Sequence, residues 1–78
     1  MPTVLFINGF KFRFYSNEND EPVHVHISKG GGNAKIWIEP IVVECYAYGF
    51  TKPQRAMILN LVKENAILLK QKWNEYFK

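Results

Sequence analysis

Hydrophobic and polar residues alternate along three stretches of the first half of the chain. This period of two is typical of β-strands that bury one face. The apolar positions of the three stretches are Phe10, Phe12 and Phe14, then Val23, Val25 and Ile27, then Ala34, Ile36 and Ile38. Two further apolar runs, 3–7 and 41–48, flank them. The pattern predicts an antiparallel meander of four or five strands within residues 3–48.

Turn signals separate these runs. Asn8-Gly9 is a strong hairpin signal, because both central positions of a type I′ turn need positive φ. A tight turn there places Phe6 opposite Lys11 and Val4 opposite Arg13. The polar run 16–22 predicts a loop between the second and third strands.

The glycine-rich segment 30–33 predicts a second hairpin. The apolar sets on either side must share a face, so the turn must hold an even number of residues. We expect a register in which His26 faces Trp37 and His24 faces Glu39.

The period changes to three and four residues after Gly49, which predicts an amphipathic helix. Thr51 is a suitable N-cap, and the helix is expected over about 52–76, roughly 36 Å at 1.5 Å per residue. A helix of that length can cross one whole face of the sheet. The prediction is therefore a single α+β domain over residues 1–78, with one long C-terminal helix packed on the sheet.

Composition and charge narrow the class of protein. The 78 residues are 47% hydrophobic and 15% aromatic, which suits a small globular domain with a dense core. The single cysteine, Cys45, excludes an internal disulfide and is expected to be a core thiol in a reducing compartment. We expect a cytoplasmic protein without a membrane span. The net charge of +3 is a weak indication of an anionic partner.

The sheet face left uncovered by the helix carries the candidate chemistry. Its residues are Lys11, Arg13, Tyr15, His24, His26, Ser28, Lys35, Trp37 and Glu39. Aromatic side chains on an open sheet can stack on RNA bases while basic ones hold phosphates. Tyr15, Trp37 and also Phe6 would stack, and Lys11, Arg13 and Lys35 would hold the backbone. The alternative is an aromatic cluster packed under a loop or a partner chain.

His24 and His26 are the only histidines, and they occupy alternate positions of one strand. Alternate residues lie about 6.6–6.8 Å apart on one face, so two imidazoles could flank a phosphate as general base and general acid. Glu39 would orient His24, and Arg13 or Lys35 would stabilise the developing charge. A histidine-based ribonuclease is therefore one use of this face, although the motif is short and unspecific.

Two other uses of this face stay open. His24 and His26 supply two metal ligands, but a zinc site needs a third or fourth, for which Asp20, Glu21 and Glu39 are the candidates. We expect no cofactor and treat metal binding as the weaker alternative. A face that also includes Val4 and Phe6 could instead pair two copies or hold a partner protein.

Several motifs together resemble the small bacterial family known as domain of unknown function 4160. They are 1–5 (MPTVL), 8–18 (NGFKFRFYSNE), 21–26 (EPVHVH), 32–37 (GNAKIW) and 72–77 (KWNEYF). Members usually have a second proline where this chain has Val23. The resemblance implies a module of a toxin–antitoxin-like gene pair, so RNA cleavage, RNA binding and a cognate small protein partner are all expected possibilities. The alternative is a non-enzymatic interaction or dimerisation module.

Overall fold

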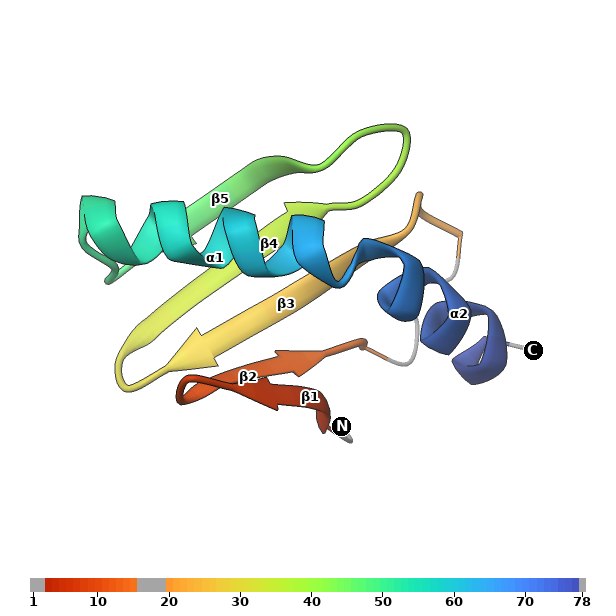
Figure 1. The fold of residues 1–78 in the computed structure, drawn as a ribbon, viewed down its shortest axis with the longest axis horizontal. Coiled ribbons are helices and arrows are strands. Elements are labelled where there is room, and N and C mark those ends of the chain that lie inside the picture. Colours follow the sequence, from red (N-terminus) through yellow and green to blue (C-terminus); the bar gives the residue numbers. More distant parts are fainter. Residues whose placement is uncertain (1–2, 16–19, 78) are drawn as a thin grey trace.

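Within residues 3–15 and 20–77, the computed structural model has one antiparallel sheet with two helices on one of its faces (Figure 1). The strands are β1 (Thr3–Ile7), β2 (Phe10–Arg13), β3 (His24–Lys29), β4 (Gly32–Trp37) and β5 (Val43–Tyr48), and the helices are α1 (Lys52–Glu64) and α2 (Ala66–Tyr76). The strand order is β1-β2-β3-β4-β5. The predicted α+β class and meander topology are confirmed. Residues 16–19, which belong to the predicted polar loop, lie outside the described residues.

The first hairpin forms as its sequence predicts. Asn8 and Gly9 both have positive φ, 53° and 82°, as a type I′ turn requires. Ile7 pairs with Phe10 and Phe6 with Lys11. The predicted pairing of Val4 with Arg13 is wrong, because an irregularity between Thr3 and Leu5 brings Thr3 opposite Arg13.

The second hairpin has the predicted parity but a different register. Lys29 pairs with Gly32, so Gly30-Gly31 is the turn, and His24 faces Trp37 while His26 faces Lys35. The predicted pairs His26 with Trp37 and His24 with Glu39 are therefore wrong by a shift along the strand. A Cβ at Gly32 would lie 2.4 Å from Cε1 of Phe50. This glycine is thus used for close packing inside β4 and not for the turn.

The C-terminal segment is two helices and not the single helix expected. Thr51 is the N-cap of α1, as predicted, and forms a capping box with Gln54. The break falls at Asn65, which has φ −110° and ψ 14° and whose side-chain Nδ2 donates to the carbonyl of Leu61 at 2.8 Å. This local hydrogen bond competes with helix continuation. The chain changes direction there, and α2 is inclined to α1 (Figure 1).

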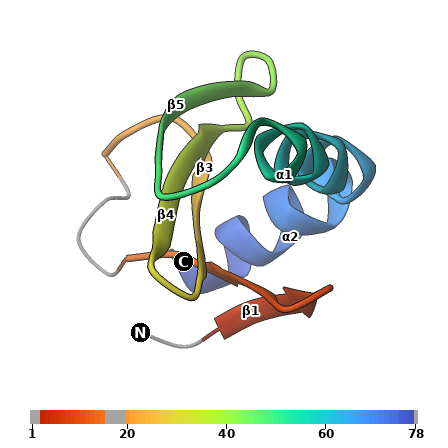
Figure 2. The same ribbon diagram turned by 90° about the vertical axis from the view of Figure 1, so that its left-hand side faces the viewer.

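Both helices lie on the same side of the sheet (Figure 2). The buried apolar side chains between the two layers are Phe10, Phe12, Phe14, Val25, Ile27, Ala34, Ile36 and Ile38 from the sheet side, and Ile58, Leu61, Val62, Leu69 and Trp73 from the helices. Cys45 is exposed on β5, so the predicted core thiol is wrong. None of the helices in the described part of the chain has both the length and the apolarity needed to cross a bilayer.

Candidate functional site

We call the sheet face opposite the helices the far face. The strand register defines three rows of side chains on it. The turn row, nearest the two tight hairpins, is Phe6, Lys11, Ser28, Asn33 and Tyr48, one from each strand. The middle row is Arg13, His26, Lys35 and Tyr46, and the end row is His24, Trp37 and Val43. Most of the sequence-predicted site residues therefore share one face.

His24 is fully buried, which contradicts the prediction of an open imidazole. Its exposed fraction is 0%. The ring lies 5.3 Å from that of Trp37 and 5.1 Å from that of Trp73 on α2. The paired part of β2 ends opposite His26, so His24 has no neighbour on β2, and the Trp73 indole contacts it there. His24 is packed on two sides by tryptophans.

The backbone fixes the tautomer of His24. Its Nδ1 lies 2.9 Å from the carbonyl oxygen of Pro22. A carbonyl oxygen can only accept, so Nδ1 must carry the proton and donate. The predicted orienting partner, Glu39, is exposed and lies beyond the residue that pairs with His24. The backbone of Pro22 takes the place that the sequence assigned to Glu39.

His26 is covered by an aromatic ring. The ring of Tyr15 stacks on it with centroids 3.9 Å apart and planes 8° apart. His24 and His26 meet edge to face at 5.2 Å. His26 is only 7% exposed. The two imidazoles are adjacent, as the strand period predicts, but both lie beneath other side chains.

Glu21 and Trp37 are among the residues that contact Lys35. Its Nζ donates to Oε1 of Glu21 at 2.7 Å and lies 4.5 Å from the ring centroid of Trp37. The side chain of Lys35 is only 12% exposed. Both contacts reduce the availability of the ammonium group to a ligand.

The β2–β3 connection accounts for this burial. Three of its described residues, Tyr15, Glu21 and Pro22, contact His26, Lys35 and His24 in turn. Figure 2 shows residues 20–23 of the connection on the side of the sheet opposite the helices. We call Tyr15, His24, His26, Lys35 and Trp37 the covered end of the far face. The prediction of a wholly uncovered face is wrong at this end.

Arg13 separates the covered end from the turn row. Its Nε is buried, and no hydrogen-bond acceptor for it is found among the described residues. A buried donor without a partner costs about 1–3 kcal/mol. Its neighbours in the strand register are Thr3 on β1 and His26 on β3.

The turn row is more accessible than the other two rows, in which only Val43, on the edge strand β5, is exposed. Phe6 is 63% exposed at one edge of the sheet and Tyr48 is 69% exposed at the other. Lys11 and Asn33 between them are also exposed. Tyr48 is stacked on Tyr46, with centroids 5.3 Å apart.

The sequence reasoning missed Asn33, Tyr46 and Tyr48. Tyr46 and Tyr48 occupy alternate positions of the chain, and this pattern could have indicated that they share one face of a strand. The irregularity between Lys35 and Ile36 in the β4–β5 pairing hid which face they occupy.

The described residues contain no group of three or more His, Cys, Asp or Glu side chains that could hold a metal ion. Glu21, a proposed third ligand, instead pairs with Lys35. The arrangement of the described residues thus gives no support to the metal alternative.

Comparison with known proteins places the chain in a family. The family model described as domain of unknown function (DUF4160) matches residues 9–74, and the chain belongs to this family. No curated protein and no solved structure gave a significant match. The family resemblance predicted from the sequence motifs is confirmed.

Proposed function

We propose that the protein is a non-catalytic binding module for single-stranded RNA and that the turn row of the far face is its contact surface. The observation that carries this proposal is a row across all five strands in which every residue except the half-buried Ser28 is exposed, with an aromatic side chain at each end. Four inter-strand spacings of about 4.8 Å make the row about 19 Å long. A surface of this length can contact several nucleotides.

The chemistry of the row suits a nucleic acid without strong sequence preference. Tyr48 and Phe6 offer ring faces, and base stacking on such rings is tolerant of sequence. Lys11 supplies a positive charge for a phosphate, while Ser28 and Asn33 supply hydrogen-bonding groups between the two rings. The stacked Tyr46 supports Tyr48 from the side, which reduces the freedom that Tyr48 loses on binding.

The ribonuclease predicted from the sequence is less well supported than binding. A phosphodiester would have to reach His24 and His26, which are 0% and 7% exposed. General acid–base catalysis requires each imidazole within hydrogen-bond reach of the atom it protonates or deprotonates. The burial of the pair favours a structural role.

The family resemblance extends the proposal to a biological setting. In a bacterial toxin–antitoxin-like pair, RNA binding by one small protein would be controlled by a cognate protein partner. RNA and the cognate protein would then compete for binding to the far face. The non-enzymatic interaction module is the alternative, with the same surface and a protein ligand.

Fluorescence anisotropy with a labelled single-stranded RNA of about 12 nucleotides tests the proposal. Tyr48→Ala should weaken binding about 5- to 150-fold, because stacking on an aromatic ring contributes about 1–3 kcal/mol per base. Tyr48→Phe keeps the ring and should bind as the wild type does. Ile67→Ala removes an equally exposed apolar side chain from α2, 76% exposed, and should have no effect.

The salt dependence separates RNA from a protein ligand. Contacts to phosphates release counterions, so RNA affinity should fall as salt increases, with a slope of log Kd against log salt of about 1 for the single cation of the turn row, Lys11. Absence of RNA binding at low salt, together with a salt-insensitive complex with a co-purified protein, would overturn the proposal in favour of the interaction module.

A further inference from the structure

Lys11 and Arg13 place two positive charges next to each other on the far face. They occupy alternate positions of β2, about 6.6–6.8 Å apart. The three rows of this face contain no Asp or Glu. Glu21, which reaches the face from the β2–β3 connection, pairs with Lys35. Neither Lys11 nor Arg13 has an ion-pair partner among the described residues.

Folding removes part of the Arg13 guanidinium from water without giving it an acceptor. The residue is half-buried, and its Nε is buried without a hydrogen-bond partner, whereas the terminal nitrogens Nη1 and Nη2 are not. A cation that is partly desolvated and unpaired is unfavourable, and a bound anion would supply the missing compensation. Part of the desolvation that binding normally requires has already taken place on folding.

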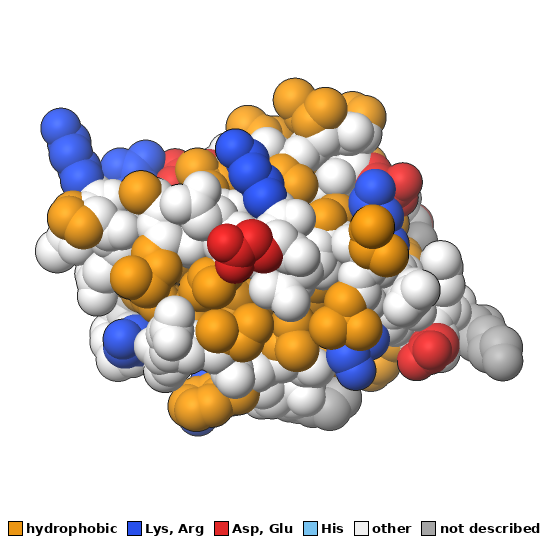
Figure 3. Space-filling view, viewed as in Figure 1, with side chains coloured by type: hydrophobic (Ala, Val, Ile, Leu, Met, Phe, Trp, Pro, Cys, Tyr) orange, Lys and Arg blue, Asp and Glu red, His pale blue; other side chains and the backbone are white. Residues whose placement is uncertain are grey.

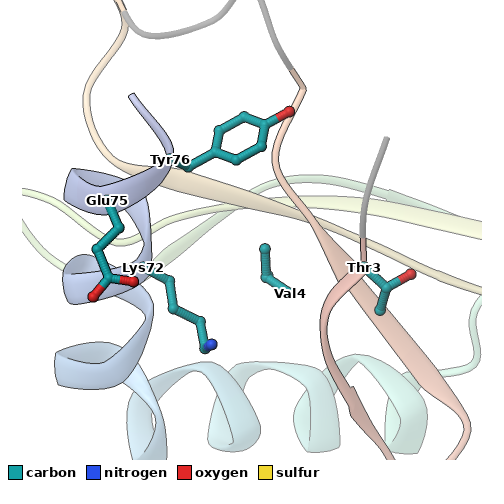
Figure 4. Close-up of a pocket in the computed structure, with 5 residues that line it drawn as sticks. All are labelled: Thr3, Val4, Lys72, Glu75 and Tyr76. Carbon is teal, nitrogen blue, oxygen red and sulfur yellow. The ribbon is translucent and has the colours of Figure 1, made fainter. Parts of the chain in front are cut away.

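The cations on the helix side are arranged differently. They are spread around a band of hydrophobic side chains and are not gathered (Figure 3). Arg55 there pairs with Glu44. A cleft of about 320 Å³ between β1 and α2 is lined by Thr3, Val4, Lys72, Glu75 and Tyr76 (Figure 4). Because Lys72 and Glu75 line the same cleft, it has no excess of positive charge with which to attract an anion.

We propose that Arg13 binds a phosphate group of single-stranded RNA, next to the phosphate bound by Lys11. This inference rests on the proposed function and extends its contact surface from the turn row into the middle row. A guanidinium can donate two parallel hydrogen bonds to a phosphate, which an ammonium group cannot. The separation of the two residues along β2 is comparable to that of neighbouring phosphates in a nucleic-acid strand. A flexible single strand that turns at β2 therefore reaches both cations in succession.

Lys35, the other lysine or arginine of the middle row, does not offer an equivalent contact. Its side chain is only 12% exposed and its Nζ already donates to Glu21 at 2.7 Å. The second phosphate is therefore assigned to Arg13 alone.

The salt dependence of RNA binding tests this assignment, because it reports how many phosphates the protein neutralises. Lys11 alone gives a slope of log Kd against log salt of about 1, and Arg13 should raise it to about 2. Arg13→Met removes the charge but keeps a long side chain. In the anisotropy assay with the same labelled RNA, it should lower the slope by about 1 and weaken binding about tenfold at low salt.

Two variants serve as controls. Arg13→Lys retains the charge, so it should keep the wild-type slope, while its affinity should lie between those of the wild type and Arg13→Met because the paired hydrogen bonds are lost. Lys63→Met, at an exposed lysine of α1, makes the same change in net charge and should leave the slope and the affinity unchanged.

Urea unfolding separates binding from a structural role of Arg13. Arg13→Met should be no less stable than the wild type, because it removes an unpaired and partly buried cation. A loss of stability in this variant, with unchanged RNA affinity of its folded fraction, would assign Arg13 to the fold and overturn the inference.

Inorganic phosphate distinguishes the RNA backbone from a free ion as the source of the phosphate. Added at constant ionic strength, it should displace the labelled RNA only weakly, because it lacks the bases that stack on Phe6 and Tyr48. Binding of inorganic phosphate that Arg13→Met abolishes, with no effect of this variant on RNA, would assign the site to a free ion and overturn the RNA contact.

The failure of this inference differs from the failure of the proposed function. RNA binding by the wild type with a slope of about 1 that Arg13→Met does not change would overturn the role of Arg13 and leave the turn row as the contact surface. Absence of RNA binding by the wild type would overturn the proposed function, and the inference with it.

Discussion

The turn row and the covered end share one sheet face and similar residue types, yet their surroundings differ. Tyr48 and Phe6 of the turn row are 69% and 63% exposed, whereas His24 and His26 of the covered end are 0% and 7% exposed. Rings in the covered end contact other rings of the same chain. Aromatic and imidazole side chains on a sheet therefore indicate a site only where nothing else in the chain covers them.

The largest expected effect at the covered end is on stability. His24→Ala removes a fully buried ring and leaves the Pro22 carbonyl without its donor. We expect a loss of about 2–4 kcal/mol in the free energy of unfolding, measured by urea denaturation. Tyr48→Ala should change it by less than about 0.5 kcal/mol. Equal effects of the two substitutions would remove the distinction between the regions.

Tyr15 tests how the covered end is closed. Tyr15→Ala removes the ring stacked on His26 but leaves the strands paired. The expected loss is about 1–2 kcal/mol, smaller than for His24, because Tyr15 is itself 36% exposed. His26 should then become accessible to diethyl pyrocarbonate at a rate that the wild type does not show. An unchanged modification rate would mean that Tyr15 is not the cover.

Lys11 tests the turn row electrostatically. Lys11→Ala should weaken RNA binding modestly and reduce the slope of log Kd against log salt by about 1. The exposed Lys63 on α1 is the matched control, and Lys63→Ala should leave the slope unchanged. A slope that falls equally in both variants would indicate general attraction by the net charge and no defined surface.

The smallest effect is expected outside both regions, at the ion pair between β5 and α1. Arg55 donates to Glu44 through Nε at 2.9 Å and Nη2 at 2.7 Å, and the hydrogen bond lowers the pKa of Glu44 from its ordinary 4.5. The stabilisation is therefore complete above pH 4.5 and is lost as the pH falls through the lower folded-state pKa.

Arg55 is exposed and Glu44 is only half-buried at the surface, so the contribution of the pair to stability should be small. Glu44→Gln should be slightly less stable than the wild type at pH 7, and the difference in unfolding free energy should narrow toward pH 3. A difference that is constant with pH would show that the ion pair contributes no stability.

Local signals predicted most of the fold. The alternation of 10–14 and 34–38, the Asn8-Gly9 turn and the Thr51 N-cap are each determined by neighbouring residues, and the structure confirms them. The break at Asn65 was missed because one polar residue scarcely alters an apolar period of three and four. The register of β3 with β4 was missed because three consecutive glycines permit several even turns, and the packing of Phe50 on Gly32 decides between them.

The candidate site was harder to predict because it depends on tertiary contacts. The shared face of Lys11, Arg13, His26 and Lys35 follows from strand period and was expected. The covering of His26 by Tyr15 and the entry of Trp73 beside His24 depend on how a long connection and a broken helix pack. No local pattern in the sequence carries that information.

The most direct test of the division of this face measures RNA anisotropy and urea unfolding in parallel on His24→Ala and Tyr48→Ala. Tyr48→Ala should lose RNA affinity with its stability unchanged, and His24→Ala should lose stability while its folded fraction binds RNA as the wild type does. A His24→Ala protein that is as stable as the wild type but no longer binds RNA would contradict the account.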